Sequence, residues 1–129
     1  LNMVNRAKFK NFEIDKYALE RYDLIVSNPP YIPSKDIKKL SKDIINFEPK
    51  EALDGGSDGL DLIKKVIYKS NILLKRNGIL ALEIGFGQYR KVSQILKHCK
   101  FKEYSKIFDY NRNVRCIIGT KTDFFKIKK

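Results

Sequence analysis

The sequence lacks several features that would define its class at once. It contains no tryptophan, one histidine and two cysteines in 129 residues. Two cysteines, Cys99 and Cys116, do not make a disulfide framework, so a reduced, cytoplasmic chain is expected. Neither their spacing nor their neighbours suggest a metal site. His98 stands near the end of an expected helix, where a cation is tolerated, and is expected to be an ordinary surface residue.

Long apolar runs are also absent. No stretch approaches the roughly 20 apolar residues that a membrane span needs. The first ten residues, LNMVNRAKFK, are polar and lack the apolar segment of a signal peptide. We therefore expect a chain without membrane contact. Its length suits one domain, which can bury about two thirds of the surface of the unfolded chain.

Charge of one sign dominates. There are 27 Lys and Arg residues against 15 Asp and Glu residues, a net charge of +12. The lysines are spread along the whole chain and are not gathered in one block, as Lys8, Lys38, Lys64, Lys91 and Lys126 illustrate. A basic surface suits any acidic partner, whether RNA, a ribosome or an acidic protein, and does not choose between them.

The apolar periodicity predicts strands that alternate with helices. Strands are expected at 6–14, 22–28, 79–85, 101–108 and 114–120, and helices at 59–78 and 88–99. The first helix has a face formed by Ile63, Val66, Ile67, Leu73 and Leu74, and the second a stripe of Val92, Ile95, Leu96 and Cys99. The pair Asn77-Gly78 is expected to end the first helix. This order is typical of an α/β domain with a mainly parallel sheet.

A long polar connection, rich in Gly and Pro, is expected at 33–59, with a helical turn near 37–45. Connections of this length are usually functional or disordered.

The stretch SNPPY, residues 27–31, directly follows the apolar run YDLIV. Two prolines offer no N–H to a sheet and fix φ, so the chain must leave the strand at Asn28. In open α/β sheets, ligands bind beyond the carboxyl ends of the strands. A turn that only ends the strand is the alternative interpretation.

The side chain of Asn28 and the carbonyl of Pro29 can provide two acceptors for the two hydrogens of a planar NH₂ group. Fixing both hydrogens favours positive charge on the nitrogen as it attacks an electrophile. Tyr31 could pack against the flat group. No ionised general base is needed, because positioning and preorganised acceptors carry the catalysis.

NPPY after a buried strand resembles the target-binding motif of amino-methyltransferases that depend on S-adenosylmethionine. Three further stretches narrow the resemblance to the PrmC/HemK family, the N5-glutamine methyltransferases of peptide chain release factors. They are NFEPKEALDGGSDGLD (46–61), LEIGFGQ (82–88) and FDYNRNVRCIIGT (108–120). The similarity extends from about residue 6 to residue 121.

The resemblance implies a partial Rossmann-like methyltransferase fold, α/β, with an antiparallel strand near the C-terminus. It implies that Asn28 and Pro29 are catalytic and hold the glutamine amide, while Pro30 and Tyr31 complete the substrate pocket. Asn28 would also lie near S-adenosyl-L-methionine. The implied partner is a release factor; membrane, metal and nucleic acid are not required.

The same resemblance places Glu48, Pro49 and the Gly55-Gly56 turn in a lid over the substrate. Ordinary turn chemistry is an equally good explanation for Gly55, Gly56 and Gly59.

One part of the family pattern is missing. The family holds the methyl donor with a Gly-rich loop after its first strand, but Gly55 is the first glycine here. The chain begins with Leu1, and its only methionine is Met3. We therefore expect residues 1–129 to be the C-terminal part of one catalytic domain. The upstream strands, the Gly-rich loop and an N-terminal helical domain would be absent, and the chain alone would be inactive.

Other functions stay open. EIGFGQ (83–88) could serve as a Gly-rich loop in a permuted DNA or RNA adenine-N6 methyltransferase, but the third small residue is missing: Gln88, Tyr89 and Arg90 follow. The acceptor could be a ribosomal-protein glutamine, which shares the motifs. A non-catalytic remnant is the third possibility, and half a doubly wound sheet would expose a strand edge and an apolar face.

Overall fold

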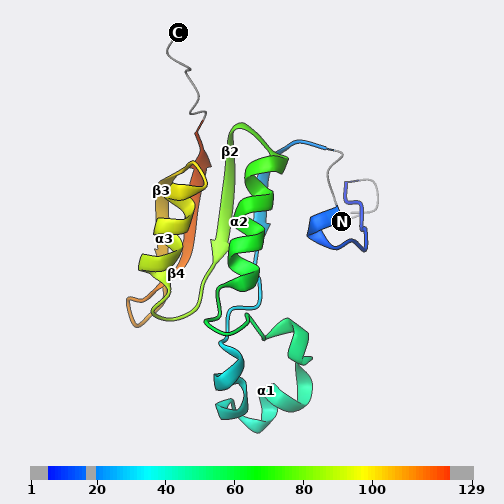
Figure 1. Cartoon of the computed structure of the whole chain (residues 1–129), viewed down its shortest axis with the longest axis vertical. Helices are drawn as coiled ribbons and strands as arrows, with labels where there is room; N and C mark the ends of the chain where they lie inside the picture. The colour runs from blue at the N-terminus through cyan, green and yellow to red at the C-terminus, as the bar shows by residue number, and fades with distance from the viewer. Residues whose placement is uncertain (1–5, 17–19, 123–129) are drawn as a thin grey trace.

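The computed structural model describes residues 6–16 and 20–122 of the chain (Figure 1). The helices are α1 (Lys42–Phe47), α2 (Asp61–Leu73) and α3 (Tyr89–His98), and the short 3₁₀ helices are η1 (Ile14–Lys16), η2 (Ser34–Lys39) and η3 (Lys50–Ala52). The strands are β1 (Tyr22–Ser27), β2 (Leu74–Glu83), β3 (Phe101–Phe108) and β4 (Val114–Lys121).

The four strands form one sheet in the order β1-β2-β4-β3. β1 pairs with β2 in parallel, and β4 is antiparallel to both of its neighbours, β2 and β3. Three strands therefore share one direction and β4 runs against them. This confirms the α/β fold with an antiparallel strand near the C-terminus. The connection between β3 and β4 is a short turn, in which the carboxylate of Asp109 accepts the backbone N–H groups of Asn111 and Asn113.

The strand predicted at 6–14 is wrong. Residues 7–13 have no regular structure, and Ile14–Lys16 form η1. The alternating pattern there includes Phe9, which is 95% exposed, and Phe12, which is also exposed. Strand propensity depends on packing against a neighbour, and the four-stranded sheet of the described structure does not include these residues.

The predicted end of the first helix is also wrong. α2 ends at Leu73, four residues before Asn77-Gly78, because Leu74 already pairs with Tyr22 in the sheet. Asn77, with φ of 58°, and Gly78 instead lie in an irregular stretch of β2. Regular pairing with β1 begins at Ile79, where the sequence predicts the strand to start.

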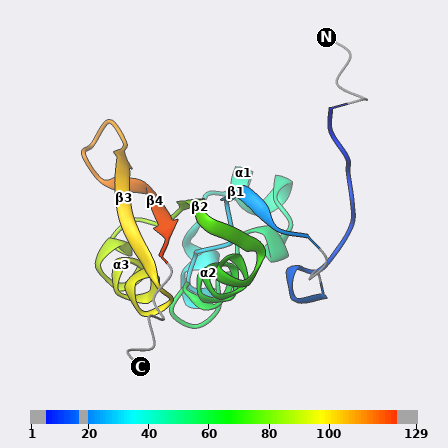
Figure 2. The same cartoon turned by 90° about the horizontal axis from the view of Figure 1, so that it is seen from above.

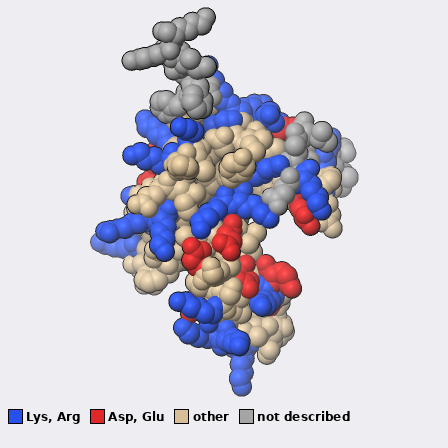
Figure 3. Space-filling model, viewed as in Figure 1, with Lys and Arg blue, Asp and Glu red and all other residues tan. Residues whose placement is uncertain are grey.

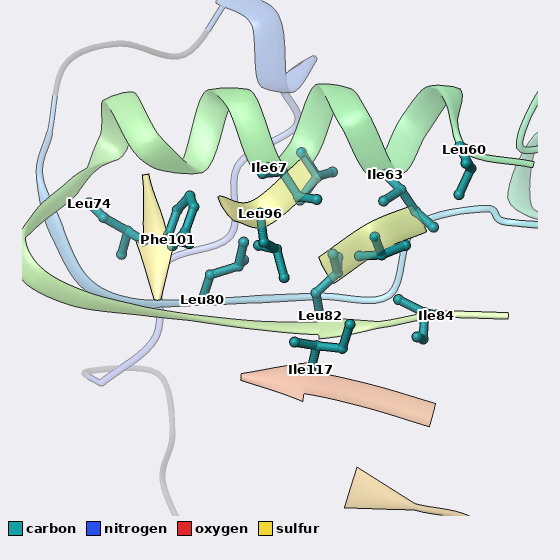
Figure 4. Close-up of a cluster of buried hydrophobic side chains, with 12 residues drawn as sticks. Leu60, Ile63, Ile67, Leu74, Leu80, Leu82, Ile84, Leu96, Phe101 and Ile117 are labelled. Carbon is teal, nitrogen blue, oxygen red and sulfur yellow. The ribbon is translucent and has the colours of Figure 1, made fainter. Parts of the chain in front are cut away.

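Both long helices cover the same face of the sheet (Figure 2). The core lies between them and the sheet, where Ile63 and Ile67 of α2 pack above Leu80, Leu82 and other buried side chains (Figure 4). From α3, Val92 and Leu96 are buried, and Ile95 and Cys99 pack against the same cluster. The two predicted apolar helix faces are therefore confirmed.

The other face of the sheet has no helix over it in the described structure. Leu24 is 54% and Val26 is 72% exposed on β1, which pairs on one side only. Their register partners, Ile79 and Ala81 of β2, continue the same apolar face. This confirms the expected open face and open edge within the residues that are described.

Positive and negative side chains are distributed differently over the surface. On the face in Figure 3, Lys and Arg are widely spread, whereas Asp and Glu gather where the sheet layer meets the segment containing α1. Within the described ranges, no helix is long and apolar enough to cross a membrane.

The core of α2 offers a matched test of this packing. Ile67 is 0% exposed and Ile72, on the same helix, is 38% exposed. We expect Ile67→Ala to lower the free energy of unfolding by about 2–5 kcal/mol, because it leaves a cavity. Ile72→Ala should cost about 1 kcal/mol or less. Urea unfolding followed by circular dichroism measures both, and equal losses would contradict the packing described here.

Candidate active site at the carboxyl end of β1

The Asn-Pro-Pro-Tyr segment lies at the carboxyl end of β1, as predicted. The last residue of the strand, Ser27, pairs with Leu82, so Asn28 follows beside the end of β2 at Glu83. Pro29 is buried, while Asn28 is exposed. Pairing of Ser27 in the sheet thus fixes the N-terminal end of the segment, and Asn28 itself stays accessible.

A cleft of about 340 Å³ opens at this segment. Its lining consists of Asn28, Pro29, Pro30, Tyr31, Ile32, Ile44, Glu48, Ala52 and Leu53. The structure therefore brings the predicted site residues Asn28 to Tyr31 together with Glu48 around one cleft. Pro49, Gly55 and Gly56, which were expected in the same lid, do not line it.

The connection between β1 and α2 folds back on itself beyond the carboxyl ends of the strands (Figure 1). The N–H of Ile32 donates to the carbonyl of Leu53, that of Gly55 to Ile32, and that of Ser34 to Gly56, at 2.8–3.1 Å. These bonds hold residues 32–34, near the start of the connection, against residues 53–56, near its end. The predicted helical turn near 37–45 corresponds to η2 and α1.

A carboxylate strengthens this closure. Asp54 Oδ1 accepts the hydroxyl of Ser34 at 2.6 Å and the N–H of Gly56 at 3.0 Å. The bond from Ser34, followed by that from Gly56, holds the pKa of Asp54 below its usual value. The base of the connection is therefore fixed by side-chain as well as backbone contacts.

The glycines of the connection permit close approach to Tyr31. A Cβ on Gly59, where φ is +75°, would lie 2.3 Å from the Tyr31 carbonyl oxygen, and one on Gly55 would lie 2.8 Å from Tyr31 Cα. Any side chain there would push Tyr31 aside. Their role in the structure is thus to let this turn pack against the site segment.

The hydroxyl of Tyr31 is held by two charged side chains that no sequence pattern connects with it. It donates to Glu83 Oε1 at 3.0 Å and accepts from Arg115 Nη2 at 3.2 Å. The guanidinium of Arg115 also lies 5.7 Å from the ring centroid. Burial, and then the hydrogen bond to Glu83, raise the pKa of Tyr31.

Gln88 is another residue whose role the sequence did not reveal. Its Nε2 donates to the carbonyls of Tyr31 at 2.9 Å and Gly59 at 3.2 Å, and its Oε1 accepts the N–H of Gly85 at 2.8 Å. One side chain therefore joins the site segment, the glycine turn and the turn after β2. The GFGQ stretch was visible in the sequence, but only as a weak Gly-rich motif.

The turn after β2 does not fit a donor-binding loop. The N–H of Gly85 is already bonded to Gln88. A Cβ on Gly85 would lie 2.9 Å from both the Tyr31 ring and Gln88 Oε1, so the protein's own side chains fill the space above this glycine. A loop that cradles a nucleotide-like ligand needs open backbone groups at this point.

A larger cleft, of about 540 Å³, lies on the other side of Tyr31. Its lining includes the 85–88 turn, Arg115 and Lys91, together with the carboxylates Asp36 and Asp58. Charges of both signs therefore line this cleft.

The histidine and the two cysteines, the remaining residues that could bind a metal, do not line the cleft at Asn28. His98 is exposed at the end of α3, as expected. Cys99 and Cys116 are free thiols whose pKa values are raised chiefly by burial. Among the described residues, no three His, Cys, Asp or Glu side chains are grouped to hold a metal ion.

Comparison with solved structures gives the class of the fold. A methyltransferase from Pyrococcus furiosus superposes with a TM-score of 0.54 over 81% of this chain and 43% of that one, at 15% identity. A putative DNA modification methylase from Thermus thermophilus gives the same score over 90% of this chain and 52% of that one, also at 15% identity. At this identity the likeness concerns the fold, which is that of a methyltransferase.

Sequence comparison gives the family. Residues 2–117 match the family model described as Eco57I restriction-modification methylase, and the chain belongs to this methylase family. A release factor glutamine methyltransferase from Clostridium acetobutylicum is 36% identical over 94% of this chain. One from Geobacter sulfurreducens is 47% identical over 78% of it. The resemblance to release factor glutamine methyltransferases is thus confirmed.

The chain spans less than half the length of these relatives. It covers 44% of the relative from Clostridium acetobutylicum and 35% of that from Geobacter sulfurreducens.

The partly buried phenol of Tyr31 predicts a pH-dependent stability. The folded state keeps this phenol protonated above its ordinary pKa of 10.0, whereas the unfolded chain ionises there. Tyr31→Phe should lower the free energy of unfolding by on the order of 1 kcal/mol below pH 10. That difference from wild type should shrink as pH rises through the raised pKa.

The matched control is Tyr110→Phe, which removes a hydroxyl from an exposed tyrosine. Urea midpoints at several pH values between neutrality and strong alkali measure both variants. A Tyr31→Phe difference that is absent, or that grows with pH, would contradict the hydrogen bonding described for this phenol.

Proposed function

We propose that this chain provides the acceptor-binding part of a methyltransferase that acts on the side-chain amide nitrogen of a glutamine in a peptide chain release factor. One observation carries the proposal: the Asn28-Pro29 pair stands at the carboxyl end of β1 and lines an open cleft. The relatives are release factor glutamine methyltransferases, one of them 36% identical over 94% of this chain, and this supports the choice of acceptor.

The chemistry of an amide nitrogen suits this cleft. An amide NH₂ is planar and presents two donors, which the Asn28 side-chain oxygen and the Pro29 carbonyl can accept together. Such a pair of fixed acceptors favours positive charge on the nitrogen during transfer and costs no reorganisation. The prolines make the acceptors rigid, because φ is fixed at both positions.

S-adenosyl-L-methionine, the proposed donor, supplies an electrophilic methyl group. Asn28 is the residue of this chain that we propose to lie beside it. No glycine precedes Gly55, and the side chains of Tyr31 and Gln88 fill the space at Gly85. We propose that residues 1–129 form the C-terminal part of one methyltransferase domain, whose donor site is completed outside the residues present here.

A permuted nucleic-acid adenine-N6 methyltransferase is the second candidate. It is favoured by the restriction-modification name of the family model and by the net charge of +12. It needs a donor loop after the acceptor motif, and the filled turn at Gly85 argues against that loop. A nucleic-acid acceptor also predicts binding that weakens steeply with added salt.

Asn28→Ala tests the acceptor site. In the complete gene product, we expect it to lower methylation of release factor glutamine by on the order of 10²–10³-fold, through loss of one fixed acceptor. Labelled methyl incorporation and mass spectrometry of the modified peptide measure this. Asn111→Ala, in the exposed turn after β3, is the matched control and should retain full activity.

Three results would speak against the proposal. Methylation of DNA or RNA with no protein glutamine modified would favour the permuted enzyme. Methylation confined to a ribosomal-protein glutamine would keep the site and change the partner. A complete gene product that methylates none of these would favour a non-catalytic remnant.

The 129-residue chain alone should bind S-adenosylmethionine weakly and transfer little or no methyl group. The reason is that no glycine precedes Gly55 and that the side chains of Tyr31 and Gln88 fill the space at Gly85. Isothermal titration of the chain with the donor measures this affinity. Saturable binding in the micromolar range would show that the donor site is already contained in these residues.

A further inference from the structure

We propose that Gln88 is a positioning residue for the acceptor: its side-chain amide sets the orientation of the Asn28–Tyr31 segment without touching the substrate. This inference rests on the proposed function of that segment. It also assigns a purpose to the GFGQ stretch, which has none as a donor loop.

The contacts of Gln88 need an amide. Its Nε2 provides two donors to two carbonyls, those of Tyr31 and Gly59, and its Oε1 accepts the N–H of Gly85. A primary amide has two donors and an acceptor on one rigid plane, whereas a carboxylate has acceptors only and an ammonium has donors only. Glutamine therefore matches all three partners at once.

The backbone of Gln88 is itself fixed by two hydrogen bonds. Its N–H donates to the carbonyl of Gly85 at 3.2 Å, and its carbonyl accepts the N–H of Val92 at 3.0 Å in the first turn of α3. Val92 and Leu96 fix that helix in the core. The amide thus extends from a rigid element, which is what precise placement of another group requires.

The Tyr31 carbonyl is an effective point from which to control Asn28. The segment is held at one end by the pairing of Ser27 with Leu82 and at the other by Tyr31. Between them, Pro29 and Pro30 have fixed φ, so few dihedral angles remain free. A rotation at Tyr31 must therefore also turn the Pro29 carbonyl and move the asparagine amide.

Gln88 acts from the far side of Tyr31. It lines the cleft of about 540 Å³ next to Arg115 and Lys91, and it does not line the cleft that contains Asn28. Gln88 contacts the Asn28–Tyr31 segment at the Tyr31 carbonyl, so we propose that its effect on transfer passes through that backbone.

Gln88→Met keeps the shape of the side chain and removes all three hydrogen bonds. Measured in the complete gene product, kcat for glutamine methylation should fall by on the order of 10²-fold, as expected for a slightly misplaced acceptor site. KM for the donor should change little. Gln94→Met, an exposed glutamine later in α3, is the matched control and should keep wild-type kinetics.

Gln88→Glu separates positioning from mere stability. The ionised carboxylate cannot donate to the carbonyls, but the protonated acid can donate to one of them and accept from Gly85. Its rate relative to wild type should therefore rise as pH falls, while the ratio for Gln88→Met stays flat. The charged groups that line the cleft with it, Asp36, Asp58, Lys91 and Arg115, and Glu83 at the Tyr31 hydroxyl, are common to all variants.

The outcomes distinguish this inference from the proposed function. If Asn28→Ala abolishes methylation and Gln88→Met retains wild-type kcat, the positioning role is wrong and the function stands. If Asn28→Ala has no effect, the proposed function itself fails. If Gln88→Met does not fold, the Gln88→Glu profile decides, and a pH-independent ratio overturns the inference. Where Gln88→Met folds, faster amide hydrogen exchange at Gly85 is the expected result independent of activity, because its N–H loses its acceptor.

Discussion

The parallel register of β1 with β2 determines where every residue of the candidate site can lie. Ser27 pairs with Leu82, so the chain leaves the sheet at Asn28 just where β2 also ends. A slip of one residue would exchange the two faces of β1 and bring Leu24 and Val26 against the helices. The segment after the strand would then lose its approach to Glu83 and to the turn after β2.

What local chemistry dictates could be predicted from the sequence. Two prolines after an apolar run predict the exit of the chain from the sheet at Asn28, and helical spacing predicts which faces of α2 and α3 are buried. The run at 6–14 could not be judged in this way. Its alternation is that of a strand, but strand formation requires a partner, and Phe9 stays exposed instead.

The contacts that fix the site depend on tertiary structure and leave no local pattern. Arg115 reaches the Tyr31 hydroxyl only because β4 runs antiparallel beside β2, and nothing in its own neighbourhood points to a residue 84 positions away. In the sequence, Gln88 is notable only because it interrupts a Gly-rich motif. In the structure, the Gln88 side chain that interrupts the motif also occupies the space at Gly85 and binds the Tyr31 carbonyl, so both observations have one cause.

The positions of the partners of Tyr31 along the chain have a consequence for folding. Glu83, Gln88 and Arg115 lie 52, 57 and 84 residues beyond it. Contacts over such separations require long loops to close, which is slow and costs chain entropy. During synthesis the Asn-Pro-Pro-Tyr segment emerges before these partners, and its tyrosine gains the last of them only when β4 is made. The competence of the site is thereby tied to completion of the sheet, and a partly folded chain would have the motif without its rigidity.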